Sequence, residues 1–101
     1  MIKFVKISKK DIIFDRKNAS DILTKACGRA KPMRVSGAFE IDERIVIALE
    51  ASVSLKTYSI VPFDDGSEDG IIGEINARYP AGFTFCFAFR IDDSTLGIFC
   101  S

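Results

Sequence analysis

The chain contains no histidine and no tryptophan, and it has only three cysteines, Cys27, Cys86 and Cys100. Without an imidazole it can form neither a Ser-His-Asp or Cys-His nucleophile nor a histidine-based zinc or iron site. Three thiols are too few for a four-thiolate metal site, and no two of them form a C-x-x-C pair. We therefore expect no metal ion, no cofactor and no catalytic residue, and a protein that is not an enzyme.

Long hydrophobic runs are also missing. The first three residues lead directly into charged positions, so we expect no signal segment, and no apolar run approaches the roughly 20 residues of a membrane span. An odd number of cysteines in a chain with an ordinary apolar core is typical of a reducing compartment. These features together predict a cytoplasmic location.

What the chain does have is an average globular composition. Its 101 residues are 48% hydrophobic and 28% charged, with 14 basic and 14 acidic side chains. A chain of this size can bury one core without a metal or disulfide. We expect one domain over residues 1–101.

The zero net charge hides a division along the chain. Residues 1–34 carry ten basic and three acidic side chains, whereas the remainder carries four basic and eleven acidic ones. Lys25, Arg29, Lys31 and Arg34 lie close together around the end of a predicted helix and could bind phosphate groups. Ordinary solvated charge is the other interpretation, because basic residues are also expected at a helix C-terminus. Anion or nucleic-acid binding by these four residues is our alternative hypothesis.

The apolar pattern predicts an α+β domain, with a mainly antiparallel sheet of five to six strands and two helices in the order β-α-β-β-β-α-β-β. Strands are expected over residues 2–7, 33–41, 44–53, 54–63, 83–91 and 96–100. No internal repeat is apparent.

Polar and small residues mark the ends of the two predicted helices. Asn18 is expected to cap the first helix and Gly28 to end it. Ser67 is expected to cap the second helix, which stops at Pro80. Its inward side chains are predicted to be Ile71, Ile72, Ile75 and Tyr79.

Alternation predicts which strand residues share a face. Met33, Val35, Phe39 and Ile41 are expected on one face of their strand, and Phe83, Phe85, Phe87 and Phe89 on one face of the C-terminal hairpin. A three-residue turn at Asp92-Asp93-Ser94 would place Phe89 opposite Gly97 and Cys86 opposite Cys100.

The segment from Asp65 to Gly70 partly matches a calcium loop. Asp65, Ser67 and Asp69 occupy its first three ligand positions, but Asn76 stands where a bidentate Glu is needed. We therefore interpret the segment as a helix-capping turn and expect no calcium dependence. The three cysteines are interpreted as small core residues.

The apolar character of both faces of the C-terminal hairpin suggests self-association. The last strand is expected at a sheet edge, with Leu96, Ile98, Phe99 and Cys100 at a homodimer interface. The other possibility is that this strand is interior and that Ile2 to Ile7 forms the edge. The sequence thus predicts a small non-enzymatic binding protein of bacterial or phage type that self-associates through its sheet.

Overall fold

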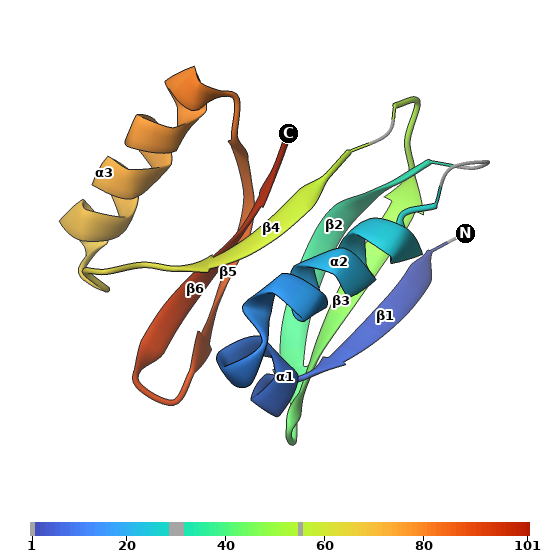
Figure 1. The fold of residues 1–101 in the computed structure, drawn as a ribbon, viewed down its shortest axis with the longest axis horizontal. Coiled ribbons are helices and arrows are strands. Elements are labelled where there is room, and N and C mark those ends of the chain that lie inside the picture. Colours follow the sequence, from blue (N-terminus) through green and yellow to red (C-terminus); the bar gives the residue numbers. More distant parts are fainter. Residues whose placement is uncertain (1, 29–31, 55) are drawn as a thin grey trace.

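The structure, a computed structural model, describes residues 2–28, 32–54 and 56–101, which form six strands and three α-helices (Figure 1). The strands are β1 (Lys3–Ser8), β2 (Met33–Ile41), β3 (Arg44–Ala51), β4 (Tyr58–Pro62), β5 (Thr84–Ile91) and β6 (Ser94–Cys100). The helices are α1 (Lys9–Phe14), α2 (Arg16–Ala26) and α3 (Glu68–Arg78), and a 3-10 turn, η1 (Tyr79–Ala81), follows α3. The predicted α+β class and element order are confirmed, with the short helix α1 as an addition.

The strands form two antiparallel sheets instead of the one sheet expected. Sheet A has the strand order β1-β3-β2, and sheet B has the order β4-β6-β5. Strand β4 begins at Tyr58, four residues later than predicted. The chain therefore leaves strand geometry between β3 and β4, and this break separates the two sheets.

Both long helices begin with a side-chain cap. The Asp15 carboxylate accepts a 3.3 Å hydrogen bond from the Asn18 N–H, and the Ser67 hydroxyl accepts a 3.1 Å bond from the Gly70 N–H. The predicted cap at Ser67 is confirmed. The predicted cap at Asn18 is wrong, because Asp15 supplies the acceptor and α2 starts one turn earlier.

The two halves of the chain repeat one β-α-β-β unit. In unit 1 (residues 2–51) and in unit 2 (residues 52–101), the last strand lies between the other two strands. The helices α2 and α3 both have 11 residues, and their caps occupy equivalent positions. The prediction that the chain has no internal repeat is therefore wrong.

The hairpins of the two units correspond residue by residue at a constant spacing of 50. Asp42 and Asp92 both begin their turns with a φ of 53°, and both first strands contain a β-bulge, between Val35 and Gly37 and between Phe85 and Phe87. Residues 38–42 read Ala-Phe-Glu-Ile-Asp, and residues 88–92 read Ala-Phe-Arg-Ile-Asp. This short segment is the part of the repeat that survives in the sequence.

The bulge in β2 overturns one of the predicted faces. Val35 pairs with Leu49 on the buried side of sheet A, whereas Phe39, beyond the bulge, pairs with Val46 on the opposite side. An extra residue in one strand reverses the alternation that follows it. Met33 and Val35 therefore do not share a face with Phe39 and Ile41.

The bulge in β5 divides the predicted row of phenylalanines in the same way. Phe85 pairs with Phe99, and Phe87 pairs with Ile98 on the other face. The turn has two residues, since Ser94 already belongs to β6, so Phe89 faces Leu96 and the predicted register is wrong. Gly97 instead makes room for Phe63, whose ring would lie 2.8 Å from an added Cβ.

Helix α2 covers one face of sheet A and also lies along β4 of sheet B (Figure 1). The Ser20 hydroxyl accepts a 3.0 Å hydrogen bond from the Ile60 N–H, and the Thr24 hydroxyl accepts one of 3.0 Å from the Tyr58 N–H. These bonds satisfy backbone groups that an edge strand would otherwise leave free. The largest fully buried side chains of the core between α2 and the two sheets are Ile7, Ile12, Leu23, Ile45, Ile47, Leu49, Ile91 and Ile98.

Helix α3 covers the other face of sheet B. Phe99 makes edge-to-face contacts with Phe63 and Phe85, and the Arg78 guanidinium lies 5.2 Å from the centre of the Phe99 ring. Ile72 and Tyr79, which were predicted to point inward, are exposed. None of the helices described over residues 2–28, 32–54 and 56–101 has the length and apolar character needed to span a bilayer.

Candidate functional site

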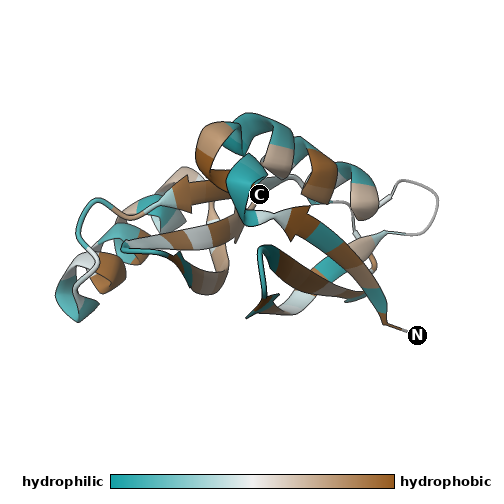
Figure 2. Ribbon diagram, turned by 90° about the horizontal axis from the view of Figure 1, so that it is seen from below, coloured by the Kyte–Doolittle hydropathy of each residue, from teal (hydrophilic) through white to brown (hydrophobic). Residues whose placement is uncertain are grey.

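The side of sheet A that faces away from α2 is bare among the described residues (Figure 2). A shallow groove of about 620 Å³ runs over it, and we call the residues that line it the open face: Phe4, Lys6, Phe39, Ile41, Arg44 and Val46. Exposed apolar side chains on soluble proteins usually stand singly. On this face of sheet A, three large ones lie together. The open face is therefore the leading candidate for a binding surface.

The repeat allows this face to be compared with its equivalent in unit 2. Phe39 and Ile41 are 52% and 47% exposed, but their equivalents in unit 2, Phe89 and Ile91, are only 8% and 2% exposed. In unit 2, this side of the sheet packs into the common core against unit 1. The same apolar surface is thus buried in one unit and left open in the other.

Two cations border the apolar part of the open face. Lys6 and Arg44 stand beside Val46 and Ile41 in the strand register, and both are exposed. A third cation near this end of the sheet, Lys9, is paired with Glu40 at 2.6 Å. The open face therefore combines apolar groups with positive charge, which suits a partner that is apolar and acidic.

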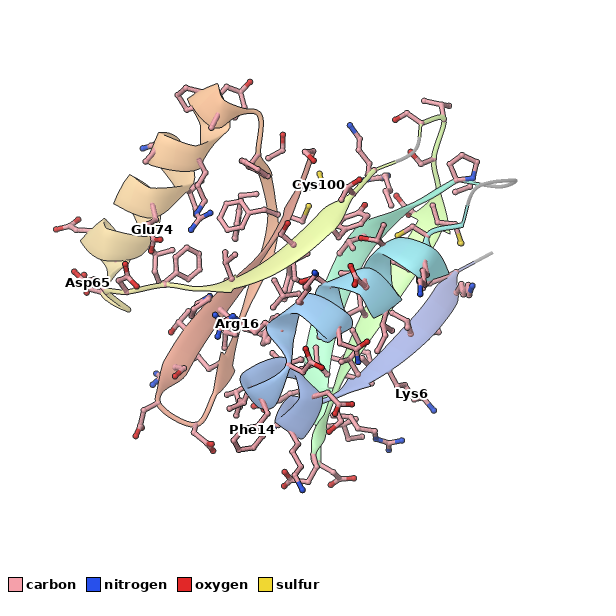
Figure 3. All side chains as sticks on the ribbon, in the orientation of Figure 1. Lys6, Phe14, Arg16, Asp65, Glu74 and Cys100 are labelled. Atoms are coloured by element: carbon pink, nitrogen blue, oxygen red, sulfur yellow. The ribbon has the colours of Figure 1, made fainter. Side chains whose placement is uncertain are left out.

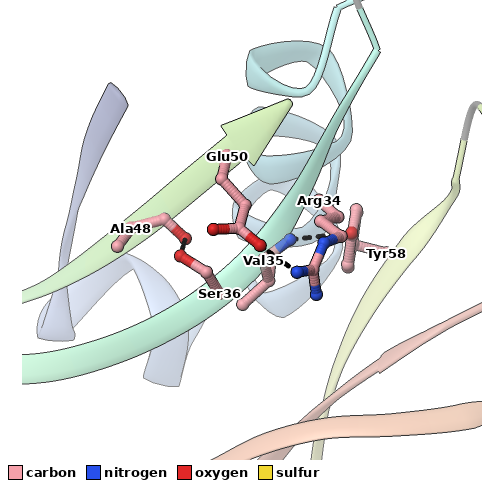
Figure 4. Close-up of polar contacts among 6 residues, drawn as sticks. All are labelled: Arg34, Val35, Ser36, Ala48, Glu50 and Tyr58. Carbon is pink, nitrogen blue, oxygen red and sulfur yellow. Dashed lines mark hydrogen bonds and ion pairs between the residues drawn. The ribbon is translucent and has the colours of Figure 1, made fainter. Parts of the chain in front are cut away.

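A second hollow, of about 500 Å³, lies where the two sheets meet. Arg34 forms an ion pair with Glu50 at its rim, and the Ser36 hydroxyl donates a 3.3 Å hydrogen bond to the Ala48 carbonyl (Figure 4). The Tyr58 hydroxyl accepts a hydrogen bond from the Val35 N–H nearby. The polar groups drawn in this close-up thus bond to one another.

The Cys86 thiol, which lines this hollow, is a poor nucleophile. Burial, together with a hydrogen bond to the Cys100 thiol, raises the pKa of Cys86 to about 12. Burial also raises the pKa of Tyr58 to about 12. A thiol must ionise to react. At neutral pH Cys86 is therefore a protonated, half-buried packing residue.

No protein-family model, curated protein or solved structure matches the chain. Function is therefore inferred from the residues themselves.

The predicted dimer residues lie inside the chain. Strand β6 is the central strand of sheet B, so its prediction as an edge is wrong. Leu96, Ile98, Phe99 and Cys100 are all buried within a single copy, Phe99 against α3 and the other three against unit 1. The other possibility, an interior last strand with Ile2 to Ile7 at an edge, is confirmed, because β6 is central in sheet B and β1 is an edge strand of sheet A.

The structure places two of the four predicted anion-binding residues. Lys25 is exposed in the last turn of α2, and Arg34 lies in β2, where Glu50 neutralises its charge. Arg29 and Lys31 lie outside the described residues. The positive character of the first third thus remains, but Arg34 already has an acidic partner.

The Asp65 segment acts as a helix cap. The Asp65 carboxylate accepts a 2.9 Å hydrogen bond from the Ser67 N–H, and bonds to Ser67 lower the pKa of Asp65. Over the described ranges no three His, Cys, Asp or Glu side chains gather as a metal site would need. The interpretation as a capping turn is confirmed at Ser67.

The open face was missed by sequence reasoning for two reasons. The bulge in β2 moved Phe39 and Ile41 to a face where alternation did not place them. The repeated Ala-Phe-x-Ile-Asp segment was the signal that could have identified the duplication. In a duplicated chain, the face that is buried between the units on one unit has an equivalent on the other unit that lies at the outside.

Proposed function

We propose that this chain is a non-enzymatic binding protein of the cytoplasm that self-associates, with a second copy covering the open face of sheet A. The observation that carries the proposal is the contrast between Phe39 and Ile41, which are exposed, and Phe89 and Ile91, which are buried at equivalent positions. The face of the sheet that is covered in unit 2 is exposed in unit 1. A second copy covers it there by the same kind of contact.

The size of the open face indicates the strength of the association. Burying a Phe or Ile side chain completely contributes about 1.5–3 kcal/mol relative to full exposure. Phe4, Phe39 and Ile41 are already about half buried. They would then contribute roughly 3 kcal/mol together, against a comparable or larger cost of immobilising two molecules. We therefore expect weak association, at hundreds of micromolar rather than nanomolar concentrations.

The proposal is tested by sedimentation velocity over a concentration series. The wild-type mass should rise above the 11.2 kDa of one chain. The double variant Phe39→Thr, Ile41→Thr keeps strand-forming residues but removes apolar area, and it should remain monomeric. Phe14→Thr is the matched control, because Phe14 is an exposed aromatic residue on α1, away from the sheet face (Figure 3). A wild-type protein that stays monomeric at about 500 μM would overturn the proposal.

Binding of a polyanion by the basic first third is the second candidate. It is supported by the ten basic and three acidic side chains of residues 1–34 and by the exposure of Lys25. The ion pair between Arg34 and Glu50 reduces the charge available for it. A phosphate ligand would have to compete with that carboxylate.

A further inference from the structure

We propose that self-association is head-to-tail, with helix α3 of one copy packing on the open face of sheet A of the next copy. This inference rests on the proposed function and specifies which part of the second copy makes the contact. It follows from how unit 1 contacts unit 2 inside the chain.

Within the chain, the contact between the units is made by a helix against an edge strand. Helix α2 covers its own sheet with Ala19 and Leu23, and it uses Ser20 and Thr24 to bond the backbone of β4. The helix thus has one side for its own unit and an adjacent side for the following unit.

Helix α3 has the same two sides, but the described part of the chain occupies only one of them. Its cap, Ser67, corresponds to Asp15 at a spacing of 52 residues, and the same spacing carries Leu23 to Ile75. Ile75 is half-buried, at the position where α2 buries Leu23.

The second side of α3 is exposed. At the same spacing, Ser20 and Thr24 correspond to Ile72 and Asn76, and both of these are exposed. Ile72 is a large apolar residue, and Asn76 offers both a donor and an acceptor to a strand edge. Over residues 2–28, 32–54 and 56–101, the positions that α2 uses to contact the following unit are therefore unpartnered on α3 within a single copy.

The open face has the matching strand edge. Phe4 of β1 pairs with Ala48 in sheet A as Ile60 of β4 pairs with Ile98 in sheet B. Both β1 and β4 are edge strands, but α2 lies along β4 and no helix of the described residues bonds the backbone of β1 in that way. A neighbouring α3 would lie along β1 and above Phe4.

Charge favours this pairing over one between two open faces. Residues 2–51 carry eleven basic and seven acidic side chains, whereas residues 52–101 carry three basic and seven acidic ones. Exposed acids, including Asp65, Glu68 and Asp69, surround the start of α3 at one end of the molecule, and Lys6 lies at the other end (Figure 3). A symmetric contact would instead bring Lys6 and Arg44 of both copies together, and like charges repel.

In an open assembly, the contact leaves one open face at one end and one free α3 at the other. Such heterologous contacts generate a ring if the rotation closes and a filament if it does not. The mass of the wild-type protein should therefore exceed that of a dimer as its concentration rises.

Two variants separate the two halves of the interface. Phe39→Glu adds a negative charge to the open face but leaves α3 intact, and Ile72→Lys adds a positive charge to α3 but leaves the open face intact. Both residues are exposed, so the fold should be retained, which circular dichroism would check. Phe14→Glu and Ile13→Lys, at exposed positions on α1, introduce the same charges as controls.

For each variant alone, the apparent dissociation constant should rise about tenfold or more, so that the variant is monomeric at concentrations where wild type associates. The controls should associate like wild type. An equimolar mixture of Phe39→Glu and Ile72→Lys should form a 1:1 dimer that does not grow further, because one intact face meets one intact helix. Sedimentation velocity distinguishes these species.

The outcomes distinguish the two proposals. A wild-type protein that is monomeric throughout refutes self-association itself. Self-association stands and the head-to-tail contact is refuted if Ile72→Lys associates like wild type. The head-to-tail contact is also refuted if each variant abolishes association but their mixture fails to restore a dimer.

Discussion

The hydroxyl of Tyr58, in β4, accepts a 2.9 Å hydrogen bond from the backbone N–H of Val35, in β2. Both residues are buried, and the bond joins sheet B to sheet A directly. The bulge of β2 begins at Val35, where the regular pairing of the strand is interrupted. A side chain of unit 2 therefore supplies a hydrogen-bond acceptor at the irregular point of unit 1.

Removing this hydroxyl should destabilise the protein. Tyr58→Phe leaves the Val35 N–H buried without an acceptor, which costs about 1–3 kcal/mol in the free energy of unfolding. Urea denaturation would measure the change. Tyr79→Phe, at an exposed tyrosine, is the matched control and should change stability little. A loss of less than about 0.5 kcal/mol for Tyr58→Phe would mean that another group replaces the hydroxyl.

Stability should decline at alkaline pH. The folded-state pKa of Tyr58 is raised from 10.0 to about 12, and that of Cys86 from 9.0 to about 12, in both cases mainly by burial. A group whose pKa is raised on folding stabilises the folded state fully below its unfolded pKa, and this contribution is lost as the pH rises toward its folded pKa. The free energy of unfolding should therefore begin to fall near pH 9 and continue to fall to about pH 12.

Substitution identifies the groups responsible for this decline. Cys86→Ala should reduce the part that begins near pH 9, to which Cys27 also contributes because burial raises its pKa, and it should leave the part due to Tyr58, which begins near pH 10. Denaturation curves at a series of pH values would show both. Identical pH profiles for wild type and Cys86→Ala would exclude the thiol as a contributor.

Calcium should not stabilise the protein. The Asp65 carboxylate is engaged with the Ser67 N–H, and Asn76 lies in α3 and stands where a calcium loop needs a bidentate Glu. The thermal midpoint should be the same in millimolar calcium and in a chelator. A rise of several degrees with calcium, absent with magnesium, would contradict this.

Heparin chromatography tests the alternative hypothesis of anion binding. If Lys25, Arg29, Lys31 and Arg34 act together, the triple variant Arg29→Ala, Lys31→Ala, Arg34→Ala should elute at clearly lower salt than wild type, because phosphate-like contacts release counterions. A triple variant at Lys10, Arg16 and Lys17, which are exposed and equal in charge, is the control. Equal retention of the first variant and wild type would remove the hypothesis.

The sequence predicted the elements well because strong local signals mark them. Ser67 is followed by acidic residues at the start of α3, and Pro80 stands just beyond its end. A turn was predicted at Asp92, and the strand predicted over residues 33–41 ends directly before the turn at Asp42. What local signals could not predict was the number of sheets, which depends on how the chain passes between β3 and β4.

The binding surface was less predictable, because burial depends on distant parts of the chain. Two bulges reversed the alternation at Phe39 and divided the phenylalanines of β5 between two faces. The equivalent segments around Phe39 and Phe89 differ in exposure although their sequences are nearly the same. Their own residues do not determine that difference, which follows from the position of α2 between the units.

The position of α2 also has a consequence for unfolding. Detaching this helix exposes the buried side of sheet A and, at the same time, frees the Tyr58 and Ile60 N–H groups of sheet B. We therefore expect the two units to unfold together. Amide hydrogen exchange should give one common opening free energy for the slowest amides of β3 and β6, the central strands of two sheets that share no strand.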